Sequence, residues 1–302
     1  MFSAKKGLVL SFLVLFCISL VDGQSRRNIR GVSDEGSTII SVIASRADGE
    51  SKPIKLENLY LYENGIEQKI KNFAYDPSPA RILIMIDNSQ TIRPDVEKLQ
   101  KAVMEFAYEI FEGDQLYVIA FDEKPEIIQE WTDDAKKMES SLALLRKKGN
   151  PYLFDALSAG VNEVLFPLMP GTRKTVVVLI SDGLDRGSKT SYELVLNELQ
   201  NNNITLYALQ IPDRTGGAYR RNQPKAAQVI TDLTEGTGGK IFPFEEAQTA
   251  AKFICDELRK NRYLLSYSPL DASSYDARRV FLVADQGISI RTKSAQPPNI
   301  KP

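Results

Sequence analysis

The sequence predicts an α/β protein in which a doubly wound, mostly parallel sheet is inserted into a smaller β region. Continuous apolar runs alternate with segments whose apolar residues recur every three or four positions, as expected when helices cover both faces of a parallel sheet. Strand-like segments lie at both ends of the chain. The segment Asp76-Pro77-Ser78-Pro79 interrupts helix and strand alike and separates the first end from the alternating part.

The first residues have the pattern of a signal peptide. Lys5-Lys6 precede an apolar run from Leu8 to Val21, and Asp22-Gly23-Gln24 follow it. The run is shorter than the ~20 residues that span a bilayer, so we expect cleavage near Gly23, with an uncleaved anchor as the alternative. Residues 1–23 are thus predicted to be removed from a secreted or periplasmic protein. Contact with a membrane is expected only through this peptide.

Cleavage would also remove one of the two cysteines. Cys17 lies inside the predicted signal peptide, and Phe16 before it is not the small residue that a lipoprotein would carry. Cys255 is then the only thiol of the mature chain, so no internal disulfide is expected. It lies among apolar residues of a predicted helix, which indicates a buried, unreactive thiol.

Residues 24–79 are predicted to form an N-terminal β region. Strands are expected over Thr38–Ser45, Leu59–Glu63 and Ile66–Phe73. Asn64-Gly65 favours the left-handed backbone of a two-residue hairpin turn between the last two strands.

Residues 80–260 are predicted to form the α/β domain. Its expected strands are Ile82–Ile86, Leu116–Phe121, Val176–Ile180 and Ile204–Ile211. Helices are expected over Val96–Ile110, Phe154–Leu165, Ser191–Gln200, Lys225–Thr234 and Glu245–Lys260.

Residues 261–302 return to strand patterns, over Arg262–Ser268, Arg279–Ala284 and Ile288–Thr292. We expect these strands to pack with the N-terminal β region in one small sheet or sandwich. Separate β units at the two ends are the alternative.

Composition excludes several classes of function. The formal net charge is -1, so no nucleic-acid partner is expected, because nucleic-acid binding needs clustered Lys and Arg; the short run Arg146-Lys147-Lys148 is interpreted as solvated surface. The chain has no His, which excludes a Ser-His-Asp or Cys-His centre and zinc hydrolysis of the HExxH type. Any chemistry depends on carboxylates, hydroxyls, Lys, Arg or a hard metal.

Two polar clusters follow predicted strands. Asp87-Asn88-Ser89-Gln90-Thr91 comes after Ile82–Ile86, and Ser181-Asp182-Gly183 comes after Val176–Ile180. Open α/β sheets bind ligands beyond the carboxyl ends of their strands, and hard cations such as Mg²⁺ prefer oxygen ligands. The same residues also suit helix caps and turns, the role expected for Asp122 and Asp185 nearby.

Asp-x-Ser-x-Thr after one strand and Ser-Asp-Gly after another resemble the metal ion-dependent adhesion site of the von Willebrand factor type A (vWA) domain. The resemblance covers about residues 81 to 258 and includes Phe121 and Leu153-Phe154-Asp155-Ala156-Leu157. Two flanking segments resemble secreted bacterial vWA-related proteins of the "Acidobacterial domain" type, namely Tyr62-Glu63-Asn64-Gly65 with Gln68-Lys69-Ile70, and Tyr263-Leu264-Leu265-Ser266-Tyr267-Ser268-Pro269.

The resemblance implies a cation site for Mg²⁺, or for Mn²⁺ or Ca²⁺. Ser89 and Thr91 would bind the metal directly, and Asp87 and Asp182 would act through water or hydrogen bonds. The family expects a further Thr ligand where this chain has Pro151. Proline has no hydroxyl, so weak binding or none is expected from this copy.

The leading functional hypothesis is a non-enzymatic adhesion module whose protein partner presents a carboxylate to the metal. The first alternative is a haloacid dehalogenase-like phosphohydrolase with Asp87 as nucleophile, although Ser89 replaces the second Asp that serves as its general acid/base. The second is a structural assembly protein with a vestigial metal site.

Overall fold

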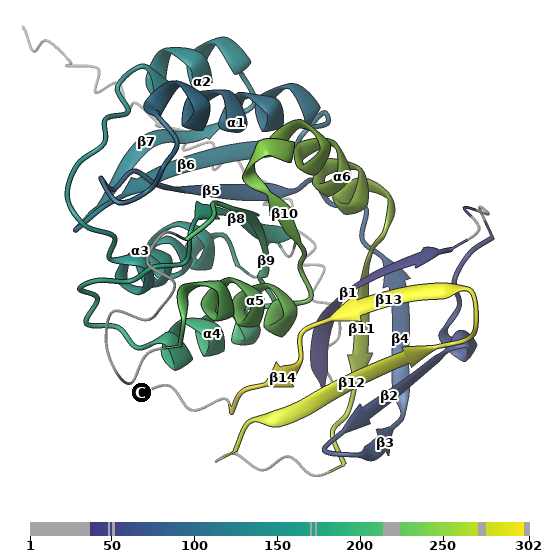
Figure 1. Cartoon of the computed structure of the whole chain (residues 1–302). Coiled ribbons are helices and arrows are strands. Elements are labelled where there is room, and N and C mark those ends of the chain that lie inside the picture. The colour runs from purple at the N-terminus through teal and green to yellow at the C-terminus, as the bar shows by residue number, and fades with distance from the viewer. Residues whose placement is uncertain are drawn as a thin grey trace, which may run out of the picture. The chain divides into compact units, whose positions relative to one another are not determined.

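The computed structural model of the chain (Figure 1) describes residues 37–47, 49, 52–169, 171–172, 174–213, 224–270 and 276–298. The described residues all belong to one compact unit of the chain. The predicted signal peptide lies outside the described residues. No helix among the described residues is long and apolar enough to cross a membrane.

A six-stranded sheet forms the centre of the α/β part, in the order β10-β9-β8-β5-β6-β7. All neighbouring pairs are parallel except β6 with β7, which is antiparallel. Every residue of β8 is buried, and only the first residue of β5 is not, which explains why these strands are continuous apolar runs. The strands are β5 (Arg81–Asp87), β6 (Gln115–Phe121), β7 (Pro125–Thr132), β8 (Thr175–Ser181), β9 (Thr205–Gln210) and β10 (Ile241–Pro243).

Helices cover both faces of this sheet (Figure 1). Ile82, Ile84 and Ile86 of β5 belong to a core shared with α1 (Val96–Glu109), α2 (Ala135–Leu142) and α6 (Ala247–Lys260). Leu83 and Met85 belong to a second core, shared with α3 (Leu153–Ala159), α4 (Tyr192–Asn201) and α5 (Ala226–Thr237). Successive residues of one strand thus face opposite helical layers. After α3 the chain continues as a π-helix over Gly160–Leu165 and a 3-10 turn over Phe166–Leu168.

The two ends of the chain supply two four-stranded sheets, in the orders β13-β1-β11-β4 and β14-β12-β2-β3. They share a core that includes Ile40, Leu61, Leu265 and Leu282. Both sheets mix N-terminal with C-terminal strands, as the pairs β1 with β11 and β2 with β12 show. The predicted fold class is therefore confirmed. The strands are β1 (Thr38–Arg46), β2 (Leu59–Glu63), β3 (Ile66–Gln68), β4 (Ile70–Tyr75), β11 (Arg262–Tyr267), β12 (Arg278–Ala284), β13 (Ile288–Thr292) and β14 (Ala295–Gln296).

Two strand predictions differ from the structure. The expected strand Ile66–Phe73 divides at Lys69, so that β3 pairs with β2 while β4 joins β11 in the other sheet. The hairpin prediction holds for β2 and β3, with φ of 48° at Asn64 and 83° at Gly65. The second difference is that β7, an antiparallel edge strand, and the short strands β10 and β14 were not predicted. From Pro125 to Gln129 the residues pass from exposed to buried without alternation, so this segment lacks the period-2 signal of a strand.

Three buried or half-buried cations connect the β region to the α/β part. Arg262, with no exposed surface, donates from Nη1 to Oγ1 of Thr205 at 2.7 Å. Arg291 donates to the carbonyls of Gly238 and Gly239 at the end of α5, each at 2.9 Å. Lys293 donates to the carbonyl of Gln200 in α4 at 2.7 Å. The last two contacts place positive charge at helix C-termini, where the helix dipole favours it.

Candidate functional site

The two polar motifs meet at the carboxyl edge of the central sheet. Because β5 and β8 are parallel neighbours, with Ile86 opposite Ile180, the next residues, Asp87 and Ser181, leave the sheet side by side. Oδ2 of Asp87 accepts a hydrogen bond from Oγ of Ser181 at 3.0 Å. Oδ1 of Asp87 accepts one from the amide of Ser89, also at 3.0 Å. The carboxylate of Asp87 is thereby fixed between the two motifs.

The two hydroxyls predicted to bind metal are adjacent. Oγ of Ser89 lies 2.8 Å from Oγ1 of Thr91. Two neighbouring ligands of an octahedral Mg²⁺, each ~2.05 Å from the ion, are separated by ~2.9 Å. The spacing of the two hydroxyl oxygens therefore fits direct coordination by one ion.

Asp182 is held in place by the turn that follows β8. Its Oδ1 accepts a hydrogen bond from the amide of Leu184 at 2.9 Å, and its side chain is 3% exposed. Gly183 adopts φ of +82°, and a Cβ there would lie 2.3 Å from the carbonyl oxygen of Ala226. Only glycine fits this turn without a shift of α5.

Burial and charge disfavour the ionised form of both carboxyls. Burial, and then the charge of Asp182, raise the pKa of Asp87 to about 7, against the lowering effect of its hydrogen bonds from Ser89 and Ser181. Burial also raises the pKa of Asp182, and the charge of Asp213 adds to the effect. A cation placed near both carboxylates would favour their ionised forms.

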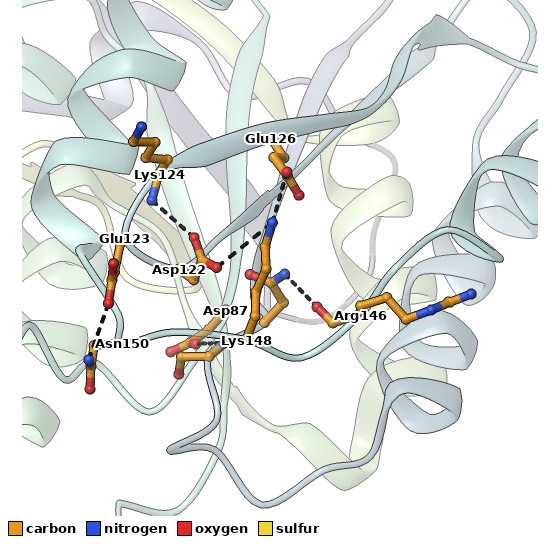
Figure 2. A network of polar contacts seen from close by, with 10 residues as sticks. Asp87, Asp122, Glu123, Lys124, Glu126, Arg146, Lys148 and Asn150 are labelled. Carbon is orange, nitrogen blue, oxygen red and sulfur yellow. Dashed lines mark hydrogen bonds and ion pairs between the residues drawn. The ribbon is translucent and has the colours of Figure 1, made fainter.

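The loop before α3 is joined to the first motif by backbone and side-chain contacts. Nδ2 of Asn88 donates to the carbonyl of Arg146 at 2.7 Å, a contact drawn in Figure 2. The amide of Lys148 donates to the carbonyl of Asn88 at 2.9 Å, and the amide of Gln90 donates to the carbonyl of Gly149 at 3.2 Å. These contacts bring residues 146–149 alongside residues 88–90.

Pro151 lies in the same loop, at the position where the resemblance predicts a Thr ligand. Its carbonyl accepts a hydrogen bond from the amide of Arg186 at 2.8 Å. Proline contributes no hydroxyl, and this carbonyl is already engaged with the loop that follows β8. The third direct ligand that the resemblance implies is therefore missing from the side chain at this position.

Sequence reasoning missed an ionic group beside the site. Figure 2 shows Lys148 reaching between Asp122 and Glu126. Its Nζ lies 2.8 Å from Oε1 of Glu126 and 3.9 Å from Oδ2 of Asp122, and the hydrogen bond to Glu126 raises the pKa of Lys148. The side chains of Lys148 and Glu126 are 45% and 54% exposed, so this ion pair lies at the surface, in agreement with the interpretation of the basic run as solvated surface. No sequence signal links Lys148 to Glu126, because Glu126 lies on the unpredicted strand β7.

Asp122 and Asp185 have the turn and cap roles expected of them. Oδ1 of Asp122 accepts from the amide of Lys124 at 3.0 Å. Oδ2 of Asp185 accepts from the amide of Ser188 at 3.3 Å, and its Oδ1 accepts from the amide of Phe154 in the first turn of α3 at 3.4 Å.

The group at this edge therefore consists of two hydroxyls and two buried carboxylates, in an arrangement that fits a hard cation. Within the described residues, no three His, Cys, Asp or Glu side chains gather into a cluster suited to a metal. A cation here would depend on the hydroxyls of Ser89 and Thr91. With little protein charge around it, such a cation would bind weakly and keep several waters.

One comparison with known proteins matches part of the chain to a domain family. Residues 82–184, which run from β5 to the turn after β8, match the family model of the von Willebrand factor type A domain. A search of curated proteins finds no match to the chain.

Several solved structures are similar to the chain. A von Willebrand factor type A protein from Catenulispora acidiphila is 12% identical with a TM-score of 0.49, and the match covers 87% of this chain and 75% of that one. An aerotolerance-related membrane protein from Bacteroides fragilis is 18% identical with a TM-score of 0.44, and the match covers 60% of this chain and 99% of that one. Proximal thread matrix protein 1 from the mussel byssus, in a structure with a zinc-occupied MIDAS motif, is 16% identical with a TM-score of 0.46, and the match covers 65% and 48%.

The family-model match spans both polar motifs and the strands that bring them together. Over residues 82–184, the chain is therefore similar to the von Willebrand factor type A domain.

Proposed function

We propose that the chain is an exported, non-enzymatic binding module that captures a protein partner through a divalent cation. Ser89 and Thr91 would hold the cation directly. Asp87 and Asp182 would act through water and hydrogen bonds. The partner would present a carboxylate, from an acidic side chain or a chain terminus.

The observation that carries this proposal is the 2.8 Å separation of the Ser89 and Thr91 hydroxyls. The two hydroxyls are hydrogen-bonded at this distance, which is also close to the spacing of neighbouring ligands on an octahedral Mg²⁺. Because Asp87 is fixed by Ser89 and Ser181, little reorganisation is needed before an ion is bound.

The open ligand position of the site supports a carboxylate partner. Asp87 and Asp182 would act on a cation through water and hydrogen bonds, and Pro151 supplies no oxygen ligand from its side chain. When bound, the cation supplies a positive charge that can accept an additional anionic oxygen ligand. A partner carboxylate would fill that position and would make partner binding dependent on the metal.

The same ion could instead serve a phosphohydrolase. That chemistry needs a second acidic residue two positions after the nucleophile to act as general acid/base. Here that residue is Ser89, whose hydroxyl is hydrogen-bonded to Thr91. A phosphatase assay on generic phosphoesters separates the two functions, because Mg²⁺-dependent turnover that is lost in Asp87→Asn would overturn the binding proposal.

The metal site is tested by calorimetric titration of the purified protein with Mg²⁺ and with Mn²⁺. We expect saturable binding to the wild type and a loss of at least about tenfold in affinity in Ser89→Ala, equivalent to ~1.4 kcal/mol. The matched control is Ser140→Ala, because the Ser140 hydroxyl is exposed and donates only to the carbonyl of Lys136. If neither Mg²⁺ nor Mn²⁺ binds, the structural alternative with a vestigial site is favoured.

Export is tested separately. We expect the protein expressed in a bacterial host with its own N-terminus to be recovered outside the cytoplasm. Mass spectrometry should place its new N-terminus near Gln24. Recovery of the uncleaved chain with the membrane fraction would support an anchor instead.

A further inference from the structure

A pocket lies at the opposite edge of the central sheet from Asp87. It has a volume of about 360 Å³, and its lining includes Tyr75, Pro77, Pro79, Phe111, Lys174 and Arg259. Lys174 directly precedes β8, and Pro79 lies just before β5, so the pocket is at the amino ends of these strands. A seven-residue strand such as β5 separates the two edges by ~20 Å.

Both connections between the β region and the α/β part contribute to this pocket. Tyr75 ends β4 and leads into the α/β part, and Arg259 lies in the last turn of α6, which leads back out of it. The two connections are joined, because the hydroxyl of Tyr75 donates to the carbonyl of Arg259. A ligand in the pocket would therefore contact both connections at once.

Lys174 gives the pocket a buried ammonium group. The residue is 3% exposed, and its Nζ lies 5.8 Å from the centre of the Tyr75 ring. Within the part of the chain that the structure describes, this ammonium forms no hydrogen bond or ion pair. Burying an ammonium whose three donors are unused is costly, and burial accordingly lowers the pKa of Lys174.

Neither of the two carboxylates whose charges act on Lys174 pairs with its ammonium, although Oδ2 of Asp76 is buried without a hydrogen-bond partner in the described residues. Asp114 accepts from the amide of Ala80 at 2.6 Å and from the amide of Phe111 at 3.3 Å. Oδ1 of Asp76 accepts from the amide and the hydroxyl of Ser78. Both carboxylates favour the charged form of Lys174 through space, but neither accepts a hydrogen bond from its ammonium.

We propose that this pocket binds a small organic monocarboxylate with an apolar body. The carboxylate would accept hydrogen bonds from Lys174. The apolar body would lie against Pro77, Pro79 and Phe111, while the Arg259 guanidinium, 4.2 Å from the centre of the Phe111 ring, adds a second positive charge.

The surrounding acidic groups favour a single negative charge on the ligand. Asp76, Glu112 and Asp114 all lie in or beside the pocket, and they would repel a dianion such as inorganic phosphate. A neutral ligand would leave the charge of the buried ammonium unbalanced. The pocket is remote from Asp87, so this binding does not depend on the proposed metal site.

The probe is sodium benzoate, titrated into the purified protein in the presence of EDTA and followed by saturation-transfer NMR. We expect saturable binding of benzoate, with binding of benzyl alcohol and of inorganic phosphate at least about tenfold weaker. Lys174→Met keeps the unbranched chain up to the position of Cε and removes the charge, and it should weaken benzoate binding at least about tenfold. The control Lys252→Met changes an exposed lysine on α6 and should bind benzoate as the wild type does.

Three results would overturn the proposal. They are no benzoate binding to the folded wild type, equal binding of phosphate, and unchanged binding in Lys174→Met. Circular dichroism checks the fold of each variant. If Lys174→Met does not fold, Arg259→Gln decides the question, because this exposed residue contributes the second cation and its loss should weaken benzoate binding severalfold.

Discussion

Lys293 is a buried cation whose removal should stabilise the protein in a pH-dependent way. It is 3% exposed, and burial, followed by the charge of Arg278, lowers its pKa from 10.5 to about 7, while Glu63 opposes the effect. At 1.36 kcal/mol for each tenfold change in acidity, keeping this lysine charged in the folded state costs ~5 kcal/mol relative to the unfolded chain.

The sign of the pH dependence follows from the lowered pKa. Below about pH 7 the lysine is protonated in both states, and the folded state bears the full penalty. Between about pH 7 and 10.5 only the unfolded chain keeps the proton, so the stability of the wild type rises with pH. Lys293→Met removes the titrating group, although it also removes the hydrogen bond to the carbonyl of Gln200, which costs ~1 kcal/mol.

Urea unfolding at several pH values, followed by the fluorescence of the single tryptophan, Trp131, measures this effect. We expect Lys293→Met to be more stable than the wild type by a few kcal/mol at pH 6.5, with the difference shrinking steadily towards pH 10. Lys252→Met, which changes an exposed lysine, should follow the wild type at every pH. A difference that does not change with pH, or a less stable Lys293→Met at pH 6.5, would refute the reasoning.

Four further outcomes follow from the structure. Arg262→Ala should lower the free energy of unfolding by ~3 kcal/mol, measured by urea unfolding, because it opens a cavity and removes buried hydrogen bonds; a change below ~1 kcal/mol would contradict the burial argument. Gly183→Ala should weaken Mg²⁺ binding in calorimetry, since its Cβ would collide with the Ala226 carbonyl and shift the turn that holds Asp182. Pro151→Thr should strengthen Mg²⁺ binding about tenfold, because the threonine hydroxyl would supply the missing ligand. Unchanged affinity would show that Pro151 is not the cause of weak metal binding. Cys255 should react with a thiol reagent only after unfolding, because burial raises the pKa of its thiol.

Much of the α/β part could be predicted because its signals are local. Ile82–Ile86 and Val176–Ile180 are apolar runs that only a strand covered on both faces explains. The polar residues directly after them, Asp87 and Ser181, then had to emerge at the same edge of a parallel sheet. The alternation of strands and helices and the two motifs of the candidate site can thus be read from short segments of the sequence.

The rest depended on contacts between residues far apart in the chain. The strand expected over Ile66–Phe73 divides between two sheets, because β3 and β4 find partners that the local pattern does not specify. Lys148 pairs with Glu126 only because β7 lies beside β6, and Lys174 becomes a buried, unpaired ammonium only where two chain connections meet.

The sequence by itself determined the fold class and the strand-end motifs, since apolar periodicity and strand-end chemistry are local properties. The tertiary structure alone decided which charges are buried and which are paired, because burial and pairing depend on how distant segments pack. For this protein, that packing placed Lys293 against α4 and formed the pocket around Lys174.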